Sequence, residues 1–189
     1  MIQLSGLTKE KMAVCAVLVF GLAFVTCTTA PVQNTPVTIN DLHVASPAAG
    51  WVESQGMYQG LTDSTIYSLL YDSTYIKYRT PVNGFITTYE NAAETTTAKA
   101  IVIDYGAAAN AAVVRDTIEN DRARYNHMVN VPGFTTHALG SQMYHELYIF
   151  GSFDKFYIEL DLKTYVSDSA AMFDACKFLT KYKSITGVQ

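Results

Sequence analysis

Apolar and polar positions alternate along several stretches of the chain, a pattern typical of strands with one buried face. These stretches are rich in Tyr, Ile, Thr and Val, and they cover 75–78, 84–89, 99–105, 135–139, 141–150 and 155–165. A short edge strand is also expected over 38–44, before Pro47 and Gly50 interrupt it. The chain therefore contains enough strands for one sheet.

Apolar residues at spacings of three and four predict a helix after Gly106, which ends the preceding strand. Arg115 and Glu119 lie four residues apart on the charged side of this helix, which we interpret as a solvated face. The apolar side consists of Ala107, Ala111, Val114 and Ile118.

A second helix is predicted over 168–183, and a shorter one is expected to begin at Thr62 or Asp63, either of which can cap it. We interpret Cys176 as a small core residue and not as a nucleophile, because a buried thiol away from cations stays protonated. The apolar stripe of the 168–183 helix is Met172, Ala175, Cys176 and Leu179.

A hairpin is predicted from the strands at 141–150 and 155–165, with 151–154 as a four-residue turn. In that register Leu147 and Ile149 share a face with Ile158 and Leu160, and Glu146 stays in water. The combined elements predict an α+β fold, a twisted and mostly antiparallel sheet with two or three helices packed on one face.

The N-terminal segment has the layout of a secretory signal. An uncharged apolar run from Met12 to Thr26 follows Lys9 and Lys11, and it is shorter than a comfortable membrane span. We therefore predict a signal peptide over 1–26, a flexible tether rich in Thr and Pro over 27–37, and a single α+β domain over 38–189.

The residues Phe24, Val25, Thr26 and Cys27 resemble the lipobox of bacterial lipoproteins, with Phe and Thr at two places where that family prefers Leu and a small residue. The resemblance implies a lipid on Cys27, which would hold the protein at a membrane surface. Cleavage after Ala30 and an uncleaved N-terminal anchor remain open alternatives. From Tyr67 to Tyr105, the body also loosely resembles uncharacterised exported α+β lipoprotein domains.

Composition agrees with one globular domain, since 49% of the 189 residues are hydrophobic and 16% are charged. The formal charge of −4 argues against a nucleic-acid partner. Without the charged residues of the signal segment, 11 basic and 16 acidic residues remain, a charge of −5. Cys176 is then the only cysteine outside the N-terminal segment, so an intramolecular disulfide is not expected.

Candidate chemistry is sparse, and no catalytic residue and no cofactor are predicted. The side chains considered for metal binding are His127, His137, His145 and Glu146, although their spacing matches no standard zinc motif. Glu159 and Asp161 share a strand face at the separation of carboxylates in glycosidases. Tyrosines on exposed sheet faces could form a binding platform, with Tyr75, Tyr78, Tyr89, Tyr144 and Tyr157 as examples.

These patterns predict an exported, non-enzymatic protein held at the cell envelope by a lipid on Cys27. Its body would bind an envelope protein or a small ligand through the sheet or its edge. Two other functions stay open: an exported hydrolase or metal-dependent protein that uses His137, His145 and Glu146, and a carrier with an apolar pocket between helix and sheet. A secreted soluble protein is the alternative location.

Overall fold

A computed structural model describes residues 35–62, 80–123, 128–134, 137–141, 146–163 and 167–188. The chain divides into two compact units, Met1–Pro36 and Val37–Gln189. Only residues 35 and 36 of the first unit are described, so the fold reported below is that of the second unit.

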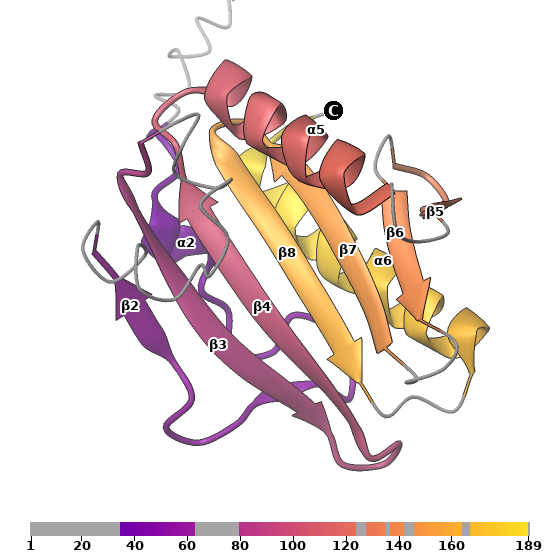
Figure 1. Cartoon of the computed structure of the whole chain (residues 1–189). Helices are drawn as coiled ribbons and strands as arrows, with labels where there is room; N and C mark the ends of the chain where they lie inside the picture. Colours follow the sequence, from indigo (N-terminus) through magenta and orange to yellow (C-terminus); the bar gives the residue numbers. More distant parts are fainter. Residues whose placement is uncertain are drawn as a thin grey trace, which may run out of the picture. The chain divides into compact units, whose positions relative to one another are not determined.

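Eight strands of the described residues form one antiparallel sheet in the order β1, β3, β4, β8, β7, β6, β5, and β2 also pairs with β3 (Figure 1). The strands are β1 Val52–Glu53, β2 Gln59–Leu61, β3 Asn83–Asn91, β4 Thr96–Asp104, β5 Met128–Asn130, β6 His137–Ser141, β7 Glu146–Phe153 and β8 Phe156–Lys163. The helices are α2 Ile39–Leu42, α5 Ala108–Ala123 and α6 Asp168–Thr186.

The helices lie on both sides of the sheet (Figure 1). α5 packs on one side, called here the α5 face, where Ala111, Val114 and Ile118 meet a cluster that includes Ile103 and Phe150. α6 and α2 pack on the other side, called here the α6 face. The predicted α+β class and antiparallel sheet are confirmed, but the expectation that all helices cover one face is wrong.

The core on the α6 face contains the only tryptophan of the chain. Trp51 is fully buried and its ring meets the edge of Phe178 of α6, with ring centroids 5.2 Å apart. Leu42 of α2 is buried in the same cluster. Ser167 caps the start of α6: its hydroxyl accepts a hydrogen bond from the Ala170 amide, which satisfies one otherwise unpaired backbone group.

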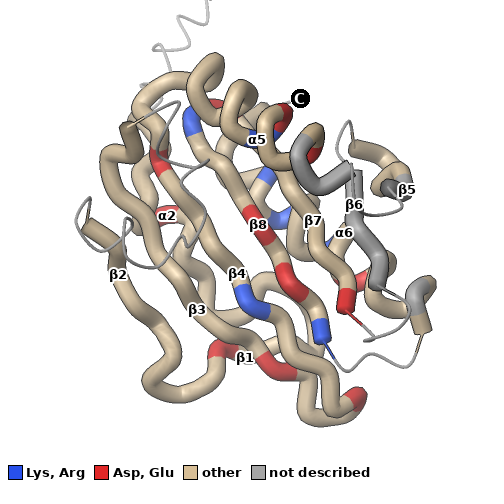
Figure 2. The backbone as a smooth tube through the Cα atoms, viewed as in Figure 1, with Lys and Arg blue, Asp and Glu red and all other residues tan. Residues whose placement is uncertain are grey.

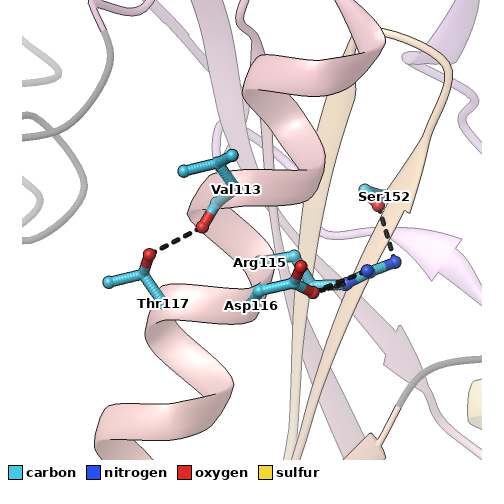
Figure 3. Close-up of polar contacts among 5 residues, drawn as sticks. All are labelled: Val113, Arg115, Asp116, Thr117 and Ser152. Atoms are coloured by element: carbon cyan, nitrogen blue, oxygen red, sulfur yellow. Dashed lines mark hydrogen bonds and ion pairs between the residues drawn. The ribbon is translucent and has the colours of Figure 1, made fainter.

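α5 is fixed to β7 by a polar contact as well as by its apolar side (Figure 3). Arg115 Nη1 donates to Ser152 Oγ at 2.9 Å, while its Nε and Nη2 atoms bond to Asp116 Oδ1. The interpretation of this side of α5 as a solvated face does not hold for Arg115, because its guanidinium reaches the sheet while it also forms an ion pair with Asp116.

The edge strand predicted over 38–44 is wrong, because Ile39–Leu42 form the short helix α2. Asp41 Oδ2 accepts hydrogen bonds from the backbone amide and the hydroxyl of Thr38, both at 2.7 Å. This capping box begins a helical turn and places Leu42 in the core. The predicted helix after Thr62 and the strand at 75–78 lie outside the described residues.

The β7–β8 hairpin has the predicted faces but a different turn. Leu147 pairs with Leu162 and Ile149 with Leu160, and only residues 154 and 155 lie between the strands. The predicted four-residue turn is wrong, because both strands extend through it. The register moves by an even number of residues, so the side chains stay on their predicted faces.

Candidate functional site

The residues considered for a metal site are not brought together where they are described. His127 and His145 lie outside the described residues. In the β6–β7 pairing Glu146 is opposite Ser141. Ser141 is four residues from His137 along β6, so the backbone positions of His137 and Ser141 are about 13 Å apart. Metal ligands must share a shell of about 2 to 2.3 Å radius. No group of three or more potential metal ligands occurs within the described ranges.

Glu146 instead contributes to a polar network on the α5 face. Its Oε1 atom lies 3.2 Å from Lys163 Nζ, and its Oε2 atom accepts a hydrogen bond of 2.8 Å from the Tyr148 hydroxyl. The hydrogen bonds from Tyr148 and Lys163 lower the pKa of the Glu146 carboxyl and outweigh the opposing effect of burial. Glu146 is therefore a stable carboxylate, and its oxygens already have partners.

Lys163 also binds a second carboxylate of its own strand, with Nζ 3.3 Å from Asp161 Oδ2. Burial opposes the charged form of Lys163, but its contacts with Glu146 and Asp161 raise its pKa overall. The pKa of Asp161 is also raised, mainly by burial, although Lys163 partly compensates. The two carboxylates near one ammonium therefore have opposite pKa shifts.

Asp161 differs from Glu146 because one of its carboxylate oxygens has no hydrogen-bond partner. The Oδ1 atom is buried and forms no hydrogen bond. Lys99, which is exposed, lies opposite Asp161 in the β4–β8 register. We define the polar sheet network as Lys99, Glu146, Tyr148, Asp161 and Lys163. A buried acceptor without a donor costs about 1 to 3 kcal/mol, so Asp161 would gain from a donor supplied by a bound group.

The network occupies the part of the α5 face that the helix leaves free. Charged residues of β4, β7 and β8 gather toward the end of the sheet away from α5 (Figure 2). Among the described helices only α5 lies on this face (Figure 1). Two lysines and two carboxylates give the network balanced charge, so it can donate and accept hydrogen bonds without strong attraction for either sign.

Glu159, considered with Asp161 as a glycosidase pair, does share the α5 face but is buried. Its Oε2 atom accepts a hydrogen bond of 2.9 Å from the Tyr157 hydroxyl. The members of such a pair must both reach the substrate. The burial of Glu159 therefore speaks against this use of the two carboxylates.

A second polar cluster lies on the α6 face, and the sequence patterns did not indicate it. His43 Nε2 lies 2.7 Å from Glu53 Oε1, which also accepts a hydrogen bond from the Thr87 hydroxyl. The His43 ring stacks on Tyr58 at 4.0 Å. Burial raises the pKa of Glu53, but the bonds from Thr87 and His43 outweigh it, so the pKa lies below its usual value.

Three buried polar groups without hydrogen-bond partners accompany this cluster in the core of the α6 face. They are Trp51 Nε1 and the hydroxyls of Tyr89 and Tyr182. Burial is the main cause that raises the pKa of Tyr89 to about 12, and the Glu53 charge adds to it. An interaction between the Tyr89 and Tyr182 hydroxyls also affects both pKa values, although it does not reach regular hydrogen-bond geometry.

The predicted tyrosine platform is wrong for the two members that the structure describes. Tyr89 and Tyr157 are fully buried, on opposite faces of the sheet. Their side chains therefore stabilise the two cores and offer no binding surface. Tyr75, Tyr78 and Tyr144 lie outside the described residues, as does Cys27, the predicted lipid attachment site.

Cys176 packs partly against the core and also lines a surface groove of about 500 Å³. Burial raises the pKa of its thiol, which agrees with an unreactive side chain. The groove lies on the outer side of α6, and not between helix and sheet where a carrier pocket was expected. Its lining residues are Pro47, Phe173, Cys176, Lys177, Thr180, Lys181 and Ser184.

Comparison with protein family models, with curated protein sequences and with solved structures finds no match to this chain. Within the ranges that the structure describes, no helix has both the length and the apolar content needed to cross a membrane.

Proposed function

We propose that this chain is an exported, non-enzymatic protein, anchored by a lipid on Cys27, whose α+β body binds a partner or ligand at the cell envelope through the polar sheet network. The N-terminal pattern of Lys9, Lys11, the apolar run and Cys27 supports export and anchoring. The single observation that supports binding is the buried, unpaired Asp161 Oδ1 atom beside the paired groups of Glu146 and Lys163.

The chemistry of the network defines what it would bind. Asp161 needs a hydrogen-bond donor, and the exposed Lys99 opposite it offers an ammonium group. A hydroxyl or amide next to a hydrogen-bond acceptor meets both requirements, as in a glycan or a peptide backbone. The flexible Lys99 side chain would move aside so that the donor reaches the buried oxygen.

The anchoring part of the proposal is tested by intact mass and fractionation in the native host. A mass that begins at Cys27 with acyl additions, together with loss of membrane retention in Cys27→Ser, supports the lipid anchor. A mass that begins at Pro31, or unchanged retention of Cys27→Ser, overturns it. The first of those results would identify a secreted soluble protein instead.

The binding part is tested by cross-linking in the native envelope, with two matched charge reversals. Lys99→Glu changes the polar sheet network, whereas Lys181→Glu changes an exposed lysine of α6 on the other side of the sheet. We expect Lys99→Glu and Asp161→Asn to abolish the cross-linked complex and Lys181→Glu to retain it. Equal loss in both lysine variants, or retention in Lys99→Glu, contradicts the proposal.

A further inference from the structure

The outer side of α6 has a stripe of exposed and half-exposed residues. The residues of this stripe recur at the spacing of one helical face and also line the groove on α6. They are Phe173, Lys177, Thr180, Lys181 and Ser184. Phe173 is 65% exposed, the highest value among the large hydrophobic side chains that the structure describes. An aromatic ring in that position is costly in water and favourable at a membrane interface.

The charge of this stripe is opposite to that of the body. α6 has three lysines in its last ten residues, although the chain as a whole has a net charge of −4. Lys177 Nζ lies 4.2 Å from the centre of the Phe173 ring and 2.7 Å from Asp174 Oδ1. Asp174 is buried, and Lys181 forms no ion pair with any described residue. The exposed surface of the stripe is therefore cationic.

The chain also enters the compact unit on this side of the sheet. Val37 is the first residue of that unit, and it packs against the core cluster that contains the buried side of α6. Pro47, from the same N-terminal stretch, lines the groove. Cys27 is ten residues before Val37 in the sequence, and ten residues reach at most about 35 Å, so a lipid on Cys27 would be linked to Val37 within that distance.

We infer that the outer face of α6 lies on an anionic membrane surface, with Phe173 at the interface and Lys177 and Lys181 against lipid phosphates. This inference deepens the proposed function. It rests on that proposal because the proposed lipid on Cys27 indicates which side of the body faces the membrane. A cationic surface next to a lipid anchor adds an electrostatic contact with anionic lipids to the hydrophobic contact of the acyl chains. The polar sheet network on the opposite face would then point away from the membrane, toward a partner.

The inference is tested with the chain from Thr28 onward, which keeps the whole compact unit and has no acyl group. Its binding to vesicles of equal parts phosphatidylglycerol and phosphatidylcholine is compared with binding to pure phosphatidylcholine at low salt. We expect measurable partition only onto the anionic vesicles. Each positive charge near such a surface raises the partition coefficient about fivefold. Lys181→Glu removes one attraction and adds one repulsion of similar size, so it should lower the partition coefficient by roughly 25-fold.

Lys99→Glu is the matched control, because it makes the same charge change on the opposite face and should leave vesicle partition within about twofold of wild type. Phe173→Ser should weaken partition, and the tryptophan emission of Phe173→Trp should shift to the blue when anionic vesicles are added. Trp51, the only native tryptophan, is buried and gives a constant background.

Absence of binding, equal binding to both vesicle types, or equal effects of Lys99→Glu and Lys181→Glu overturns the inference. Loss of a protein cross-link in Lys181→Glu without any vesicle binding would identify a protein as the occupant of this face instead. The vesicle assay contains no acyl group on Cys27, so its outcome is independent of the mass measurement that tests the anchor.

Discussion

His43 Nε2 lies 2.7 Å from Glu53 Oε1, and this contact joins the segment after α2 to strand β1. Thr87 of β3 donates to the same oxygen, so one carboxylate connects three parts of the α6 face. All three side chains are at least partly buried, which makes the carboxylate difficult to replace by water.

This arrangement predicts a specific loss of stability in acid. The folded pKa of Glu53 lies below its usual value of 4.5, so the stability that Glu53 contributes is fully present above that value and is lost as pH falls through the folded pKa. Glu53→Gln should lower the free energy of unfolding at pH 7 by about 1 to 2 kcal/mol and flatten its dependence on pH below 4.5. Urea unfolding of both proteins over that pH range measures this. An unchanged pH slope in Glu53→Gln contradicts the prediction.

Removal of the Tyr89 hydroxyl should not destabilise the protein, whereas removal of the Tyr157 hydroxyl should. Both rings are fully buried, but the Tyr89 hydroxyl has no hydrogen-bond partner and that of Tyr157 donates to Glu159. We expect Tyr89→Phe to leave the free energy of unfolding unchanged or raise it by up to about 1 kcal/mol, and Tyr157→Phe to lower it by about 1 kcal/mol. Equal losses in chemical denaturation would show that the Tyr89 hydroxyl has a partner after all, either the Tyr182 hydroxyl or an ordered water.

Gly84 of β3 is required for close packing against β4. A Cβ atom on Gly84 would lie 2.5 Å from the carbonyl oxygen of Val102, whereas one on Gly60 would meet only the Tyr58 hydroxyl at an ordinary 3.7 Å. Gly84→Ala should lower the free energy of unfolding by about 1 to 3 kcal/mol, and Gly60→Ala should change it by less than about 0.5 kcal/mol. Thermal unfolding of the two variants tests this, and similar midpoints would refute it.

The contact between Arg115 and Ser152 should stabilise the docking of α5. A double-mutant cycle with Arg115→Met and Ser152→Ala should give a coupling energy of about 0.5 to 1 kcal/mol, since the hydrogen bond is partly buried. The Arg115 contact with Asp116 is more exposed, so Asp116→Ala should cost less than about 0.5 kcal/mol. A coupling energy near zero would show that α5 is held by its apolar side alone.

The elements that the sequence predicted correctly are those whose pattern is local. α5 and α6 have apolar residues at helical spacing over several turns, and β8 alternates along its whole length, so each could be predicted without its neighbours. The β7–β8 turn was misplaced because an even shift of register leaves the alternation intact. α2 was missed because four residues are too few to show helical periodicity.

The face that each helix covers, and the second polar cluster, depend on contacts between distant residues. Ile101, Val102 and Ile103 of β4 are all buried, which shows that β4 is covered on both sides. Alternation alone does not distinguish this from one covered face. Glu53 and Thr87 are 34 residues apart in sequence and meet only because β1 pairs with β3. No motif in the sequence indicates that contact.

The pairing of β1 and β2 with the same edge of β3 also affects how molecules could associate. Those two strands have two and three residues, and β5 at the opposite edge has three. Among the described residues, the long strands are therefore all interior, and each edge offers only a few backbone groups to a second chain. Growth of the sheet into a polymer by strand addition is thereby disfavoured.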